Sequence, residues 1–155
     1  MSTALALLLS SVLCADPAVP QNAARPVIIA HRGASGHRPE HTFAAYDLGV
    51  AMGADYIEPD LVVTADGKLV ARHDLDLGPT TDAAAVWAGR QTERTVDGHV
   101  STGWFSDDFT LAEVRQLKAR QPREDRSKAH DGQHAVPTWP DILAWAAAQP
   151  RPIGL

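Results

Sequence analysis

A small set of polar residues in this sequence could together cleave a phosphate ester. His31 and His73 could serve as acid and base, because histidine is the side chain that titrates near neutral pH. Glu58 and Asp60 offer carboxylate oxygens, the ligands that Ca²⁺ and Mg²⁺ prefer in proteins. Arg32 could hold a phosphate through paired hydrogen bonds. These residue types therefore predict metal-assisted chemistry at a phosphate ester.

The elements around these residues predict that they meet at one end of a sheet. Residues 27–30 form a continuous apolar run, typical of a strand buried on both faces. Thr42 can cap a helix over 43–52, which Gly53 would end, and residues 56–63 return to strand character. Strand, helix and strand in this spacing predict a βαβ unit, so the fold class is α/β with a mainly parallel sheet.

Alternation along the second strand places Glu58 and Asp60 on one face. The Asp-Gly pair at 66–67 favours a two-residue hairpin turn. With that turn, the register puts Asp60 directly opposite His73, within cross-strand reach. The candidate base or acid and a candidate metal ligand are thus expected to be neighbours.

The later part of the chain predicts fewer regular elements. Residues 74–137 carry several turn signals and are interpreted as a long insertion, in which the Trp104-Phe105 pair is expected to pack. One helix is expected there, from Thr110, which forms a capping-box pattern with Glu113, to about residue 120. The chain beyond the insertion predicts another helix from Thr138 to before Pro150, with Pro140 in its first turn, and then the start of a strand at 152–155.

Each candidate has an ordinary structural alternative. A Glu-x-Asp pair on a strand faces solvent more often than it binds a metal, and a lone histidine is more often structural. The structural interpretation is therefore assigned to five histidines: His37, His41, His99, His130 and His134. The convergence of His31, Glu58, Asp60 and His73 at the ends of adjacent strands favours function for those four.

Composition narrows the classes of protein. The chain has 155 residues, 45% of them hydrophobic and 21% charged, which fits one packed domain or part of a larger one. The formal net charge of −5 argues against a general nucleic-acid binder. The only cysteine, Cys14, allows no intramolecular disulfide.

The first residues suggest export. The apolar stretch 4–15 is too short to span a bilayer but suits a secretory signal peptide. Residues 1–25 are therefore predicted to be a signal peptide and flexible lead-in, and 26–155 the folded domain, in the periplasm or secreted. The alternatives are a misassigned start or a disordered terminus. A lipid anchor on Cys14 is disfavoured because Leu13 precedes it.

Longer motifs carry a resemblance to a known family. HRGASGHRPEHT, GADYIEPDLVVTADGKLVARHD, GWFSDDFTLAEV and AVPTWPDIL resemble the glycerophosphodiester phosphodiesterase family, in its secreted, periplasmic branch, over residues 27 to about 150. The resemblance implies a TIM-type barrel. It also implies hydrolysis of deacylated phospholipids, such as glycerophosphocholine, to sn-glycerol 3-phosphate and an alcohol.

The resemblance also implies roles for single residues. His31 and His73 match the acid and base pair, and Arg32 matches the arginine that contacts the phosphate. Glu58 and Asp60 match two ligands of the divalent cation, Ca²⁺ or else Mg²⁺. Among the neighbouring loop residues, Glu40 matches the acidic residue of the family's Pro-Glu-Asn-Thr-like loop, whereas His41 replaces the commoner Asn. Whether water or the substrate's own glycerol hydroxyl attacks, and which histidine is the base, stays open.

Length departs from the family pattern. Such barrels need about 250 residues, so the 155-residue chain is expected to be an amino-terminal half, a fragment or truncated gene product, with exposed strand edges. A non-catalytic remnant that binds phosphate or a divalent cation weakly is the main alternative. A phosphodiesterase of another barrel family, acting on intact phospholipids, is less favoured. The alcohol preference and the oligomeric state stay open.

Overall fold

The computed structural model describes residues 25–155, so the predicted signal peptide and Cys14 lie outside the described residues. The elements, in chain order, are β1 (Ile29–His31), α1 (Phe43–Ala51), β2 (Tyr56–Glu58), β3 (Leu61–Val63), β4 (Leu69–Ala71), α2 (Ala83–Val86), β5 (Thr92–Val96), β6 (His99–Gly103), the 3₁₀ turn η1 (Ser106–Asp108), α3 (Leu111–Val114) and α4 (Trp139–Ala147). No helix among residues 25–155 has the length and apolar character needed to cross a membrane.

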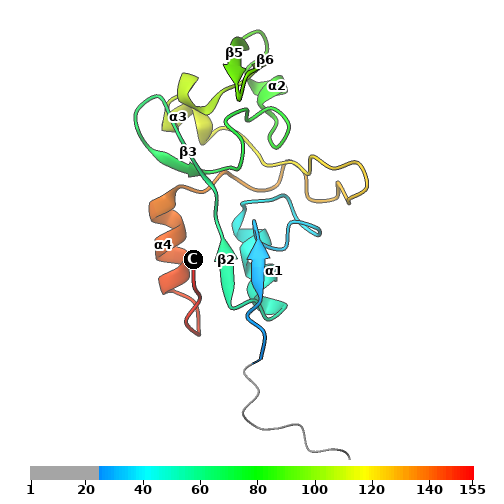
Figure 1. The fold of residues 1–155 in the computed structure, drawn as a ribbon, viewed down its shortest axis with the longest axis vertical. Helices are drawn as coiled ribbons and strands as arrows, with labels where there is room; N and C mark the ends of the chain where they lie inside the picture. Colours follow the sequence, from blue (N-terminus) through cyan, green and yellow to red (C-terminus); the bar gives the residue numbers. More distant parts are fainter. Residues whose placement is uncertain (1–24) are drawn as a thin grey trace, which may run out of the picture.

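The strand, helix and strand predicted at the start of the domain are present. β1 and β2 are parallel neighbours, with His31 opposite Glu58, and α1 connects them (Figure 1). The Thr42 hydroxyl caps α1 by accepting a hydrogen bond from the amide of Ala45, which lies in the first turn, where amides have no carbonyl partner four residues earlier in the helix. The βαβ prediction is therefore confirmed.

Two apolar clusters hold the described chain together. One lies between β1, β2, α1 and α4, in the lower half of Figure 1, and is built around Tyr46, Ile57, Ala71 and Ile142. The other lies among β3, β4, α2 and α3 and includes Val62, Val70, Trp87, Phe109 and Leu117. Burial of these side chains contributes most of the driving force for folding.

The second predicted strand is divided at Pro59. Its first part, β2, pairs with β1, and its second part, β3, forms an antiparallel hairpin with β4. Proline has no N–H for a ladder hydrogen bond, so pairing changes partner there. The described residues thus form three two-stranded sheets and no closed barrel.

The predicted hairpin register was wrong by one residue. Leu61 lies opposite Ala71, and the same count brings Asp60 opposite Arg72 instead of His73. The loop has three residues, because the amide of Lys68 bonds to the Thr64 side chain and Gly67 adopts a φ of +72°.

Two other expectations also fail. β1 is not buried on both faces: Ile29 is 61% exposed, and among the described residues β1 has only one strand neighbour, β2. The helix that begins at Thr110 has the predicted capping box but ends at Val114 instead of near residue 120. Residues 118 and 119 form extended bridges with Ala135 and Thr81, and this pairing competes with the helix.

The predictions at the end of the chain hold. α4 begins at the Thr138 cap, with a capping box to Asp141 and proline in its first turn. Gly154 then forms a parallel bridge with Tyr56, so the predicted strand start lies beside β2. Phe105 is buried, which confirms that this aromatic residue packs.

Candidate active site

His31 ends β1 at the edge of the two-stranded parallel sheet. The parallel register sets it beside Glu58, and its Nε2 lies 3.9 Å from Glu58 Oε2. The imidazole side chain is 71% exposed. It can therefore meet a ligand from solvent while it stays next to a carboxylate.

Arg32 is surrounded by carboxylates. Its backbone amide donates to Glu58 Oε2 at 2.9 Å, and its Nη1 donates to both oxygens of Glu40 at 3.2 and 3.3 Å. Its Nε lies 3.5 Å from Asp60 Oδ2 in an ion pair without hydrogen-bond alignment. The residue adopts a φ of +59°, which is uncommon for a side chain larger than glycine and turns the guanidinium toward this cluster.

His41 contacts Asp60 of this carboxylate cluster. The sequence predicted only a structural role for His41. Its ring is fully buried, with Nδ1 3.2 Å from the Tyr46 hydroxyl and Nε2 3.2 Å from Asp60 Oδ2. A carboxylate can only accept, so Nε2–H donates to Asp60, and Nδ1 accepts from Tyr46. Burial first, and then the charge of Arg72, lower the pKa of His41 to about 3.

Arg72 supports the loop that carries Glu40 and His41. This arginine was not among the candidate residues predicted from the sequence. Its side chain is buried, and Nη1 donates to the carbonyl oxygens of Glu40, His41 and Ala71. Burial lowers its pKa to about 10, so it remains a cation at neutral pH. An arginine that directly follows the apolar strand Leu69–Ala71 is the sequence signal that could have found it.

His73 lies two residues after β4, and the observed register places Arg72, not His73, opposite Asp60. Its Nδ1 pairs with Asp74 Oδ1 at 2.8 Å, not with Asp60. A carboxylate on Nδ1 selects the tautomer whose Nε2 is free for proton exchange. The half-exposed ring thus has one nitrogen available for chemistry.

The carboxylates fit a hard cation only in part. Glu58 and Asp60 each use one oxygen in the contacts above, and the second oxygen of each forms no hydrogen bond with residues 25–155. Two such oxygens suit Ca²⁺ or Mg²⁺. Within the described part of the chain, no group of three or more His, Cys, Asp or Glu residues could hold a metal ion. The two residues would therefore supply a minority of the ligands.

A depression of about 200 Å³ opens over His31 and Arg32. Ser35 and Glu40 complete one wall, and the opposite wall comes from a distant part of the chain: Pro122, Arg123 and Arg126. Three of its seven lining residues are arginines and one is the carboxylate Glu40, so the lining carries a net positive charge, which suits an anionic ligand.

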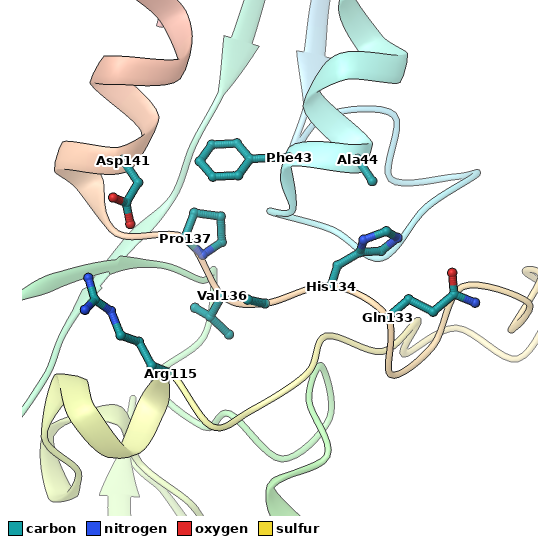
Figure 2. A pocket seen from close by; sticks show the side chains of 9 residues that line it. Phe43, Ala44, Arg115, Gln133, His134, Val136, Pro137 and Asp141 are labelled. Carbon is teal, nitrogen blue, oxygen red and sulfur yellow. The ribbon is translucent and has the colours of Figure 1, made fainter.

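A larger depression, of about 520 Å³, lies elsewhere (Figure 2). Phe43 and Ala44 of α1 line one side, and Arg115, just after α3, lies across from them. Asp141 on its rim already accepts hydrogen bonds from Thr138. None of the candidate catalytic or metal-binding residues lines this depression, so size alone does not identify the site.

Comparison with known sequences identifies one family. The model of the glycerophosphoryl diester phosphodiesterase family matches residues 31–153. A glycerophosphodiester phosphodiesterase of Arabidopsis thaliana is 37% identical over 138 residues, which cover 88% of this chain and 37% of the relative. A glycerophosphodiester phosphodiesterase of Haemophilus influenzae is 39% identical over 115 residues, covering 73% of this chain and 30% of the relative.

Solved structures agree with the sequence comparison. A glycerophosphodiester phosphodiesterase from Agrobacterium tumefaciens superposes with a TM-score of 0.55 at 34% identity, covering 77% of this chain and 42% of the other. An Oleispira antarctica phosphodiesterase, solved in complex with the product sn-glycerol-3-phosphate, gives 0.54 at 29% identity, with 77% and 39% covered. The chain spans less than half the length of these relatives.

Proposed function

Because the chain belongs to the glycerophosphoryl diester phosphodiesterase family, we propose that it serves the hydrolysis of glycerophosphodiesters to sn-glycerol 3-phosphate and an alcohol. One observation carries the proposal beyond family membership. Arg32, held by Glu40 and Asp60, lies next to the exposed His31 in a depression whose lining includes two further arginines. The product in the Oleispira antarctica relative is an anion of the kind that such a depression would accept.

The reaction needs one proton acceptor and one proton donor. A nucleophile oxygen bonds to phosphorus as one histidine takes its proton, and the bond from phosphorus to the alcohol oxygen breaks as the other histidine protonates that oxygen. We assign these transfers to Nε2 of His31, which lines the depression, and to Nε2 of His73, whose Nδ1 is already paired with Asp74. Arg32 donates hydrogen bonds to the phosphoryl oxygens and stabilises the charge that grows on them.

A divalent cation, Ca²⁺ in preference to Mg²⁺, is part of the proposal. Glu58 and Asp60 would hold it through their free oxygens, and it would neutralise phosphoryl charge when bound. The backbone amide of Arg32 fixes the Glu58 carboxylate, and His41 fixes that of Asp60. Hydrogen bonds of this kind orient metal ligands before the ion arrives.

The proposed location is the periplasm or the exterior of the cell, because residues 4–15 have the length and apolar character of a secretory signal. Cell fractionation with an antibody to residues 26–155 tests this proposal. Recovery of the full-length chain in the cytosol would contradict it.

A second candidate function is weak binding of phosphate or a divalent cation without turnover. It is favoured by the finding that residues 25–155 contain no cluster of three or more metal-ligating side chains. Sparse ligands leave a cation poorly held, and catalysis then suffers more than binding does.

One assay separates the two functions. The 155-residue protein is incubated with glycerophosphocholine and Ca²⁺, and release of sn-glycerol 3-phosphate is measured with and without chelator. Hydrolysis predicts cation-dependent release that His31→Ala and His73→Ala each lower by about 10²-fold or more. His37→Ala is the control, because His37 is exposed and does not line the depression.

Two other outcomes would contradict hydrolysis by these residues. Release that survives both His31→Ala and His73→Ala would overturn the proposed chemistry. No release from the wild-type protein, together with binding of sn-glycerol 3-phosphate that perturbs the His31 imidazole NMR signals, would support the second function. Thermal melting of each variant excludes loss of the fold, which is not expected for such exposed side chains.

A further inference from the structure

The wall that faces His31 and Arg32 comes from the loop 121–128, which none of the roles above includes. Arg123 and Arg126 of this loop line the depression together with His31 and Arg32. About ninety residues separate the two walls in sequence, so only the fold brings them together. The second wall adds two guanidinium groups to a chain whose formal net charge is −5.

The loop is fixed against the first wall by hydrogen bonds. The Gln121 side-chain amide and Arg126 Nη1 both donate to the carbonyl oxygen of Ser35 at 2.9 Å. Lys128 Nζ closes the loop by donating to the carbonyl oxygens of Gln121 at 2.6 Å and Arg123 at 2.9 Å. The Arg126 guanidinium and the backbone of the loop at Arg123 are therefore held in place before a ligand binds, which lowers the entropic cost of binding.

The two walls differ in how their charge is balanced. Arg32 already faces Glu40 and Asp60, so its charge is matched within the protein. Arg126 is half-buried and forms no ion pair with any residue in 25–155. The one hydrogen bond that its side chain makes with these residues goes to the uncharged carbonyl of Ser35. A partly desolvated cation without a counter-charge is unfavourable by itself and becomes favourable when an anion binds beside it.

Arg123 adds a second, weaker cation to the same wall. Its Nε lies 3.4 Å from Asp125, and both side chains are mostly exposed. Such an exposed pair is worth little and exchanges easily for a ligand. The loop wall thus adds two positive charges beyond Arg32, which already faces the proposed position of the phosphodiester.

We propose that Arg126, assisted by Arg123, forms a second anion subsite that selects glycerophosphodiesters whose alcohol carries a further anionic group, a carboxylate or a phosphate. The proposal rests on the function above, which places the scissile phosphate at Arg32. The diester would lie across the depression, with its phosphate on the first wall and the anion of its alcohol on the second. Arg126 would then discriminate between substrates without taking part in bond cleavage.

Matched ligands test the subsite. Glycerophosphoserine differs from glycerophosphoethanolamine by one carboxylate, and glycerophosphoglycerol carrying a terminal phosphate differs from glycerophosphoglycerol by one phosphate. Dissociation constants are measured by calorimetry with Ca²⁺ in a His31→Ala background, so that turnover does not consume the ligand. We expect the anionic member of at least one pair to bind about fivefold more tightly, as for one partly exposed charge-assisted contact.

Substitutions locate the discrimination. Arg126→Gln is expected to reduce the affinity ratio within a pair to about one, and Arg126→Lys to retain part of it. Arg120→Gln is the matched control, because it removes the same charge from an exposed neighbour that does not line the depression. Arg123→Gln serves as a second variant if thermal melting shows that Arg126→Gln unfolds the loop.

The outcomes distinguish the two proposals. Equal affinities within both pairs, or a ratio that survives both Arg126→Gln and Arg123→Gln, would overturn the subsite. An affinity ratio that depends on Arg126, found while the wild-type protein releases no sn-glycerol 3-phosphate, would support the subsite and contradict the hydrolytic function. Which pair discriminates identifies the anion as a carboxylate or a phosphate.

Discussion

The buried His41 predicts an acid-sensitive fold. Its pKa is lowered from 6.5 to about 3, mainly by burial, so the folded protein keeps this ring neutral where the unfolded chain protonates it. Between these two values the unfolded state binds more protons than the folded state. The free energy of unfolding therefore rises with pH in this window, and the contribution is lost as pH falls below 6.5.

The size of the effect follows from one proton. Linkage limits the slope to about 1.4 kcal/mol per pH unit, and an unfolded pKa of 6.5 gives a loss of about 2 kcal/mol between pH 7 and pH 5. This loss hardly depends on the folded pKa as long as it stays below about 4. The burial-related pKa changes of Tyr46 and Arg72 act in the alkaline range, so they do not contribute.

Urea unfolding at pH 7, 6 and 5, followed by tryptophan fluorescence, measures this loss. His41→Asn removes the titrating ring and should flatten the dependence by about 2 kcal/mol over the same range, whatever its effect on stability at pH 7. His134→Asn is the comparison variant: burial lowers the pKa of His134 as well, but its ring is less buried than that of His41, so this substitution should flatten the dependence less than His41→Asn does. A wild-type protein equally stable at pH 7 and pH 5, or an unchanged slope in His41→Asn, would refute the reasoning.

Two further substitutions test the support of the site. Arg72→Ala should lower the free energy of unfolding in urea by about 3 kcal/mol, because three buried carbonyl oxygens lose their donor and a cavity forms; a loss below about 1 kcal/mol would contradict this. Gly33→Ala should cost about 2 kcal/mol or more in the same assay, since residue 33 has a φ of +79° and a Cβ there would lie 2.7 Å from the carbonyl carbon of Ala45. Gly36→Ala, which meets nothing within 4 Å, should stay within about 0.5 kcal/mol of wild type, and equal effects of the two alanines would contradict the close approach.

Local sequence signals predicted the parts of the fold that depend on neighbours in the chain. The caps at Thr42 and Thr110 were predicted because a hydroxyl accepts a hydrogen bond from an amide only three residues away. The meeting of His31 with Glu58 also followed, since parallel strands bring equivalent ends together. These interactions need no knowledge of distant segments.

Distant contacts decided the parts that sequence reasoning missed. Asp66 accepts hydrogen bonds from the Thr64 hydroxyl and from the amide of Leu111, 45 residues away, and these contacts accompany the three-residue loop that shifts the register. Neither contact follows from the turn preference of an Asp-Gly pair. The burial of His41 likewise depends on Arg72 and Tyr46 reaching the same loop from different elements.

The candidate site combines a fixed base with exposed reactive groups. Arg32 reaches Asp60, Asp60 reaches His41, and the backbone of the same loop is held by the buried Arg72. His31 and His73 are exposed, with His31 beside Glu58 and His73 beside Asp74. A preorganised charge costs no reorganisation when substrate charge develops. Substitution of a buried member should therefore disturb the proposed phosphate binding by Arg32, through Asp60, although neither His41 nor Arg72 lines the depression in which we propose that the phosphate binds.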